Sequence, residues 1–185
     1  RGLTKETASA KITTQQNETI NPLELRGYDD KAAEELPRTN QMKKTLKPFQ
    51  IEGARFLSER YHALLADEMG LGKTVTALAA SQMVGSVKAL IVCPASVRTN
   101  WAQEISECGM VRSHFNIVSY NEAVKGLPGS WDLLVLDECH FLKTPTSLRC
   151  QAVFGNGTGL ARRAQRIWGL SGTPVLNRPR ELYPI

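Results

Sequence analysis

The stretch Leu64-Leu65-Ala66-Asp67-Glu68-Met69-Gly70-Leu71-Gly72-Lys73-Thr74 decides the fold of this 185-residue chain. A short apolar run leads into a loop with two glycines, and the loop ends in Lys-Thr where a helical pattern begins. Backbone N–H groups of such a loop form a concave anion site, and the N-terminus of the following helix adds positive potential to it. Gly70 and Gly72 give the loop its conformational freedom. The stretch therefore predicts a site for phosphate groups.

Two side chains at the end of this loop match the chemistry of a nucleoside triphosphate. Lys73 can reach the terminal phosphates, and the Thr74 hydroxyl can ligate magnesium. The general pattern G-x-x-x-x-G-K-[ST] would place glycine at position 67, where this chain has Asp67, so only the shorter G-x-G-K-T is present. An ordinary surface turn would also fit the loop when it is read alone.

Composition fits one globular domain with a core and an intracellular location. Hydrophobic residues make up 42% and charged residues 22%, which is typical of such a domain. The net charge of +5 is compatible with a polyanionic partner without requiring one. Four cysteines and three histidines lack metal-ligand spacing, which favours reduced thiols. No apolar run is long enough to span a membrane, and no signal peptide is visible. We expect a cytoplasmic protein in a bacterium or phage, or a nuclear one in a eukaryote, with no membrane partner.

Strand and helix patterns alternate after a polar start. Residues 1–45 are expected to form a lead-in that is partly ordered at most, and residues 46–185 the folded domain. Apolar runs predict strands at 64–66, 89–93, 115–118, 131–136 and 166–170, and helical spacing predicts helices at 48–61, 74–84, 97–108 and 121–124. The alternation predicts an α/β fold with a mostly parallel central sheet flanked by helices.

Two adjacent carboxylates end the fourth predicted strand. Asp137 and Glu138 follow the run Trp131–Leu136, at the edge where a parallel sheet presents its ligands. Asp137 can hold magnesium and Glu138 can activate or position a water molecule. The 64 residues from Lys73 to Asp137 leave room for two βα units, and we expect both to lie at the ends of neighbouring strands. Two acids at this place would equally suit a helix N-cap.

Polar residues elsewhere extend the predicted site. Gln50 stands in the first turn of a helix, and its amide has the donor and acceptor that match the N6 and N7 edge of adenine. Taken alone, it also reads as a solvated glutamine. Ser171-Gly172-Thr173-Pro174 follows the last predicted strand and is also typical of an ordinary turn.

These segments together resemble the Swi/Snf-type ATPases of helicase superfamily two. Leu46–Gln50 resembles the Q motif, Asp67–Thr74 motif I, Pro94–Glu104 motif Ia, Asp137–His140 motif II, and Ser171–Pro174 motif III. In this family Asp67 is the expected residue. Phe141-Leu142-Lys143 after the acids, and Asn177 and Glu181-Leu182-Tyr183 after motif III, most resemble the annealing-helicase branch and its bacterial and phage relatives.

The resemblance implies a P-loop NTPase fold, with residues 46–185 as the first RecA-like lobe of a motor that uses ATP and Mg²⁺ on double-stranded or branched DNA. It implies that Lys73, Asp137 and Glu138 are catalytic and that Thr74 and Asp137 hold Mg²⁺. The ATP-binding residues would be Gln50, Met69, Gly70, Leu71, Gly72, Lys73 and Thr74. His140, Ser171 and Thr173 would couple nucleotide state to lobe movement, although a structural role suits His140 nearly as well. DNA contacts would involve Ser96, Arg98, Tyr120 and Asn121, with Arg162, Arg163 and Arg166 either extending that track or forming a solvated face.

Motifs IV to VI and their arginine finger would belong to a second RecA-like lobe. An arginine finger accelerates phosphoryl transfer on the order of 10³–10⁵-fold, so we expect these 185 residues to hydrolyse ATP poorly or not at all. Two other functions stay open. A P-loop kinase acting on a small acceptor would share the phosphate loop and the magnesium site, and the lobe alone could be a non-catalytic nucleotide- or DNA-binding module.

Overall fold

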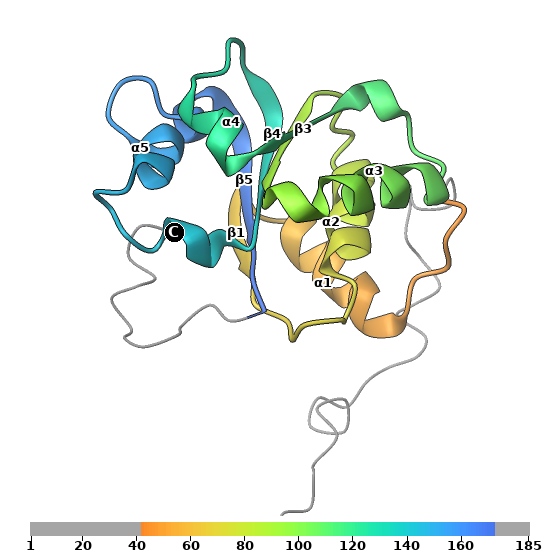
Figure 1. Cartoon of the computed structure of the whole chain (residues 1–185). Helices are drawn as coiled ribbons and strands as arrows, with labels where there is room; N and C mark the ends of the chain where they lie inside the picture. Colours follow the sequence, from red (N-terminus) through yellow and green to blue (C-terminus); the bar gives the residue numbers. More distant parts are fainter. Residues whose placement is uncertain (1–41, 173–185) are drawn as a thin grey trace, which may run out of the picture.

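A five-stranded parallel sheet forms the centre of the molecule (Figure 1). The computed structural model describes residues 42–172. Its strands lie in the order β1 (His62–Leu65), β5 (Ala164–Leu170), β4 (Trp131–Asp137), β2 (Ala89–Cys93) and β3 (Phe115–Ser119). Every neighbouring pair is parallel. The predicted α/β fold with a parallel sheet is confirmed.

Helices cover both faces of the sheet, as Figure 1 shows. On one side lie α1 (Pro48–Ser58), α2 (Lys73–Met83) and α3 (Arg98–Glu107), and on the other α4 (Tyr120–Val124) and α5 (Leu148–Phe154). Short 3-10 helices complete the connections: η4 (Ala95–Val97), η5 (Arg112–His114), η6 (Cys139–Leu142) and η7 (Leu160–Arg163).

The sheet is buried between two apolar layers because successive side chains of a strand point to opposite faces. In β2, Ile91 and Cys93 belong to the core under α1, α2 and α3. Leu90 and Val92 belong to the core under α4 and α5. All five β2 residues are buried, as the continuous apolar run predicted.

The strand register brings the carboxyl ends of all strands to one edge of the sheet. Leu170 of β5 pairs with Leu65 of β1 and with Asp137 of β4, and Cys93 of β2 pairs with Ser119 of β3. We call this the carboxyl edge and the opposite one the amino edge. The loop before α2, the two acids and Ser171 all follow strand ends at the carboxyl edge.

The strand order departs from the sequence expectation in one respect. β1 and β4 are not neighbours, because β5 is inserted between them. The expectation that Lys73 and Asp137 follow neighbouring strands was therefore wrong. The sequence contains no local signal for this order, because β5 joins the sheet from the far end of the chain.

Other predictions fall wholly or partly outside the described residues. The structure gives no placement for residues 1–41, so only the end of the predicted lead-in is described, and Thr173, Pro174, Asn177 and Glu181–Tyr183 lie outside the described range. Within residues 42–172, no helix is both long and apolar enough to cross a membrane.

Candidate nucleotide site

The loop before α2 has the geometry of an anion site. Gly70 and Gly72 have φ angles of 82° and 78°, the left-handed region that favours glycine. Gly72 is the N-cap of α2, where no side chain caps the helix and the first turn contains no acidic residue. The N–H groups of a first helical turn have no partner within the helix. This helix N-terminus is therefore suited to an anionic ligand.

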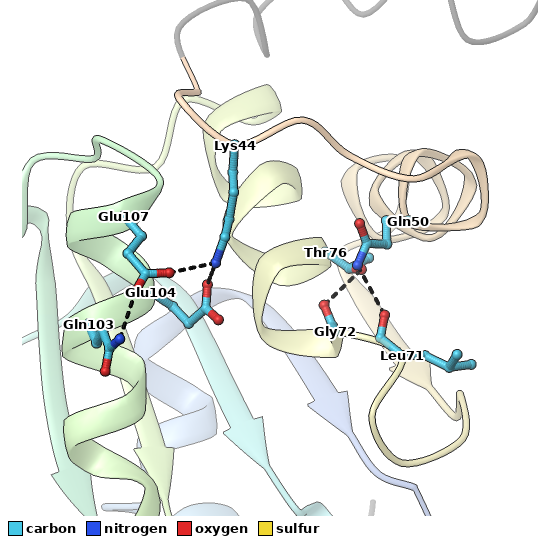
Figure 2. A network of polar contacts seen from close by, with 8 residues as sticks. All are labelled: Lys44, Gln50, Leu71, Gly72, Thr76, Gln103, Glu104 and Glu107. Carbon is cyan, nitrogen blue, oxygen red and sulfur yellow. Dashed lines mark hydrogen bonds and ion pairs between the residues drawn. The ribbon is translucent and has the colours of Figure 1, made fainter.

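Gln50 packs directly on this loop (Figure 2). Its Nε2 donates to the Leu71 carbonyl at 3.1 Å, and its Oε1 accepts from the Lys47 N–H at 2.9 Å, which caps α1. A Cβ at position 72 would collide with Gln50 Nε2, so Gly72 is required by close approach as well as by its φ angle. The structure thus places the predicted adenine-reading residue against the phosphate loop.

The Lys73 side chain folds back onto the loop that precedes it. Its Nζ donates to the carbonyls of Asp67 and Glu68, each at 2.9 Å. Burial raises the pKa of the Asp137 carboxyl, and the positive charge of Lys73 opposes that rise. A triphosphate would replace the two carbonyls as the partner of Lys73. Lys73 and the predicted metal ligand Asp137 therefore both follow strand ends at the carboxyl edge, with β5 between those strands.

Asp137 is a buried carboxylate held on both oxygens. Only 9% of the residue is exposed. Its Oδ2 accepts from Trp101 Nε1 at 2.7 Å and its Oδ1 from the Glu138 N–H at 3.0 Å. Burial raises the pKa of Asp137, and the nearby Glu138 carboxylate acts in the same direction, whereas the Trp101 hydrogen bond and Lys73 lower it.

Glu138 has a strained backbone. Among the non-glycine residues that the structure describes, only Glu138 has a positive φ, with φ 49° and ψ 50°. The left-handed conformation costs about 1–2 kcal/mol for an L-residue. Strain of this kind clusters at functional sites. Glu138 stands at the N-cap position of η6, as the alternative predicted, but its side chain does not cap that helix.

His140 connects the acids to the end of β5. Its Nδ1 lies 3.1 Å from Glu138 Oε2 and 3.5 Å from Ser171 Oγ. The next residue, Gly172, lies against the phosphate loop, where an added Cβ would come within 2.6 Å of Met69 Cγ and 3.5 Å of Lys73 Nζ. The segment after β5 therefore lies against both His140 and the glycine loop.

The four predicted DNA contacts divide into two kinds. Ser96 and Asn121 are exposed near the carboxyl edge, and so is Arg98, which pairs with Glu122 at 3.0 Å. Tyr120 is 3% exposed, and its hydroxyl donates to the Asp137 carbonyl at 2.8 Å. Tyr120 thus supports Asp137 from inside the protein, and its ring is not presented to a ligand at the surface.

The predicted arginine track lies elsewhere. Arg163 and Arg166 flank the start of β5, at the amino edge. Arg163 Nη1 donates to the Leu127 and Gly129 carbonyls, and Arg166 Nη1 to those of Ser58 and Arg60. These side chains bind the protein's own backbone at the amino edge of the sheet, whereas Ser96 and Asn121 lie near the carboxyl edge.

Trp101 falls within the predicted helix 97–108 and within the segment that resembles motif Ia, and the sequence predicted no separate role for it. It is 1% exposed, and its indole N–H donates to Asp137, 36 residues away in the chain. The available signal was general: a buried tryptophan N–H needs an acceptor. All four thiols are free and buried, and burial raises the pKa of Cys139 to about 12, as suits a packing residue.

A short segment before α1 is clamped to the end of α3 (Figure 2). Lys44 Nζ lies 2.6 Å from Glu104 Oε2 and 2.7 Å from Glu107 Oε2. The Lys43 N–H donates to the Cys108 carbonyl at 3.1 Å. These contacts raise the pKa of Lys44 and lower that of Glu107. The clamp fixes the approach of the chain to α1 and hence to Gln50.

The donor set fits magnesium better than a structural metal. Across residues 42–172, no three His, Cys, Asp or Glu side chains are grouped to hold a metal ion. Thr74 and Asp137 offer a hydroxyl and a carboxylate at the phosphate site. Mg²⁺ takes hard oxygen ligands and completes its shell with water and phosphate. The residues present therefore fit an ion that arrives with a nucleotide.

Comparison with known proteins identifies the fold and then the family. The structure aligns with the Sulfolobus solfataricus SWI2/SNF2 ATPase core in complex with dsDNA, with a TM-score of 0.68 and 23% identity, over 78% of this chain and 35% of that one. The fold is that of a RecA-like ATPase lobe.

Residues 49–125 match the model of the SNF2-related domain. The SWI/SNF-related matrix-associated actin-dependent regulator of chromatin subfamily A-like protein 1 of Xenopus tropicalis is 34% identical over 75% of this chain and 17% of its own length. The DNA annealing helicase and endonuclease ZRANB3 of Mus musculus is 28% identical over 78% of this chain and 16% of its own length. Residues 49–125 belong to the SNF2-related family, and the chain spans about a sixth of the length of these relatives.

Proposed function

We propose that this chain is the ATP-binding first lobe, residues 46–185, of a DNA-dependent ATPase that moves along or remodels double-stranded DNA. One observation carries the proposal: the glycine loop with Lys73, the acids Asp137 and Glu138, and Ser171-Gly172 converge at the carboxyl edge of one parallel sheet. Ligands of open α/β sheets bind at this edge. In a family of ATPases, this convergence fits a triphosphate.

Each side chain has a part that follows from its position. Lys73 exchanges the Asp67 and Glu68 carbonyls for phosphate oxygens, and the uncapped start of α2 adds backbone donors. Thr74 and Asp137 would hold Mg²⁺, which when bound would supply positive charge to the phosphate oxygens. Gln50 sits beside the loop, where its amide can meet adenine.

Glu138 acts on the attacking water, and His140 and Ser171 link Glu138 to the end of β5. Glu138 positions and deprotonates the attacking water. His140 contacts both Glu138 and Ser171, so a change at the acids reaches the end of β5. Ser171 and the following Thr173 would pass this change to the rest of the motor, a second RecA-like lobe included.

Nucleotide binding is the decisive test for this lobe. Titration of a fluorescent ATP analogue into the 185-residue chain should show Mg²⁺-dependent binding, and Lys73→Ala should weaken it by about 10- to 100-fold, the worth of a charged hydrogen bond. Lys88→Ala, which removes an exposed lysine near the amino edge, is the matched control and should leave affinity unchanged. Equal affinity of wild type and Lys73→Ala would contradict the proposal.

DNA binding is proposed for the exposed part of the carboxyl edge, around Ser96, Arg98 and Asn121. Hydroxyl, amide and guanidinium groups suit phosphate contacts without base reading. Arg98 would exchange its Glu122 partner for a phosphate. Affinity for labelled duplex DNA should fall steeply with salt and be reduced in Arg98→Ala. Arg166→Ala, at the amino edge, is the control, and a larger loss in it than in Arg98→Ala would relocate the interface.

A further inference from the structure

Asp137 accepts hydrogen bonds from both faces of the sheet, one at its carboxylate and one at its main-chain carbonyl. Trp101 of α3 reaches Oδ2 from the core layer that contains α1, α2 and α3. Tyr120 of α4 belongs to the opposite core layer, and its hydroxyl donates to the Asp137 carbonyl. Neither residue faces solvent, since 1% of Trp101 and 3% of Tyr120 are exposed. Trp101 therefore holds the side chain of Asp137, and Tyr120 holds its main chain.

We propose that Trp101 is a positioning residue that holds the Asp137 carboxylate in the orientation needed to bind Mg²⁺ with the nucleotide. The inference rests on the proposed function and adds a residue that does not itself touch substrate or metal. With Oδ1 taking the Glu138 N–H and Oδ2 taking the indole N–H, the plane of the carboxylate is fixed. Each oxygen retains a lone pair for the magnesium ion or its water shell.

Packing alone would not require this indole to donate here. A buried tryptophan can satisfy its N–H with any carbonyl, as Trp168 does with the Arg60 carbonyl at 3.2 Å. Trp101 instead donates at 2.7 Å to a carboxylate, which is a shorter and stronger kind of hydrogen bond. Groups that orient metal ligands in this way typically change metal affinity by 10–100-fold when removed.

The two tryptophans make a matched pair for the test. Trp101→Phe and Trp168→Phe each remove one buried indole N–H from a residue that is at most 1% exposed. Affinity for a fluorescent ATP analogue is measured with Mg²⁺ and with excess chelator. Trp101→Phe should weaken binding about 10-fold with Mg²⁺ and leave it unchanged in chelator. Trp168→Phe should change neither, although both variants lose stability.

A measurement on the unaltered chain covers the case in which a variant fails to fold. The indole N–H resonances of Trp101, Trp131 and Trp168 are followed by ¹H–¹⁵N NMR. Addition of Mg²⁺ to the chain saturated with a non-hydrolysable ATP analogue should shift the Trp101 signal most. An unmoved Trp101 signal overturns the inference, as does equal Mg²⁺ dependence in Trp101→Phe and wild type.

These outcomes are distinguishable from failure of the proposed function. A wild-type chain that binds nucleotide in a Mg²⁺-dependent way, with Trp101 insensitive to it, overturns the role of Trp101 alone. A wild-type chain whose nucleotide affinity ignores Mg²⁺ overturns the metal site and the positioning role together. A loss in chelator as large as the loss with Mg²⁺ assigns Trp101 to general packing and also overturns the inference.

Discussion

At the amino edge of the sheet, Arg163 and Arg166 donate to main-chain carbonyls of neighbouring loops, and their guanidinium groups stack over Trp131 and Tyr61. At the carboxyl edge, Asp137 is a buried acid with a raised pKa, and Glu138 has a left-handed backbone. Charged side chains at the first edge join pieces of backbone. At the second edge, the burial of Asp137 and the backbone strain of Glu138 each cost folding free energy, as is common at functional sites.

Removal of Arg163 should have the largest effect on stability. Its guanidinium also donates to the Thr158 carbonyl at 3.4 Å, so Arg163→Ala removes hydrogen bonds to three main-chain carbonyls in two connecting segments. The free energy of unfolding should fall by about 2–3 kcal/mol. Denaturant titration measures it, and nucleotide affinity should be unchanged. The adjacent exposed Arg162→Ala should stay within about 0.5 kcal/mol of wild type. If Arg163→Ala lost nucleotide affinity without losing stability, the amino edge would not have the purely structural role assigned to it.

Glu138→Gly should stabilise the protein at the carboxyl edge. Glycine adopts a φ of 49° without the side-chain clash, which outweighs its greater freedom in the unfolded chain and the lost His140 contact. The expected gain is about 1 kcal/mol in the free energy of unfolding. Glu138→Gln is the control that keeps the strain and removes the base. In the complete motor both variants should lower hydrolysis by at least about 100-fold. A destabilised Glu138→Gly would show that the backbone here is not strained.

The Lys44 clamp should give the smallest change. Its ion pairs are partly exposed, so Lys44→Ala should lower the melting temperature by about 1–3 °C near neutral pH, and less at high salt. The pKa of Glu107 is lowered, so its contribution is present above its ordinary pKa and is lost as the pH falls. The difference in melting temperature between wild type and Lys44→Ala should therefore shrink as the pH falls below the ordinary pKa of glutamate. A difference that persists in acid would assign the effect to packing.

Local sequence patterns predicted most of the helices and strands and the glycine loop before α2. The run 89–93 became β2 with the predicted bounds, and Gly70 and Gly72 adopt the positive φ angles that their positions required. Short-range patterns decide such features, so one sequence contains enough information for them. α5 was not predicted, because Leu148–Phe154 is only seven residues long and has no sustained apolar period.

Long-range contacts account for what the sequence did not reveal. The insertion of β5 between β1 and β4, the Trp101 contact with Asp137 and the burial of Tyr120 all join segments that are distant in the chain. Arg163 and Arg166 show the same limit, because the sequence of a basic run is the same whether its side chains bind a ligand or the protein's own backbone. The types of side chain at the site were predictable, but their supporting partners were not.

The insertion of β5 also sets the distance between β1 and β4. With one strand between them, β1 and β4 stand two inter-strand spacings apart, about 9–10 Å. That width separates the strand that leads to Lys73 from the strand that ends in Asp137, and a sheet hydrogen-bonded on both sides holds it nearly constant. β5 thus sets the separation between the strand ends that lead to Lys73 and Asp137, and no side chain has to set it.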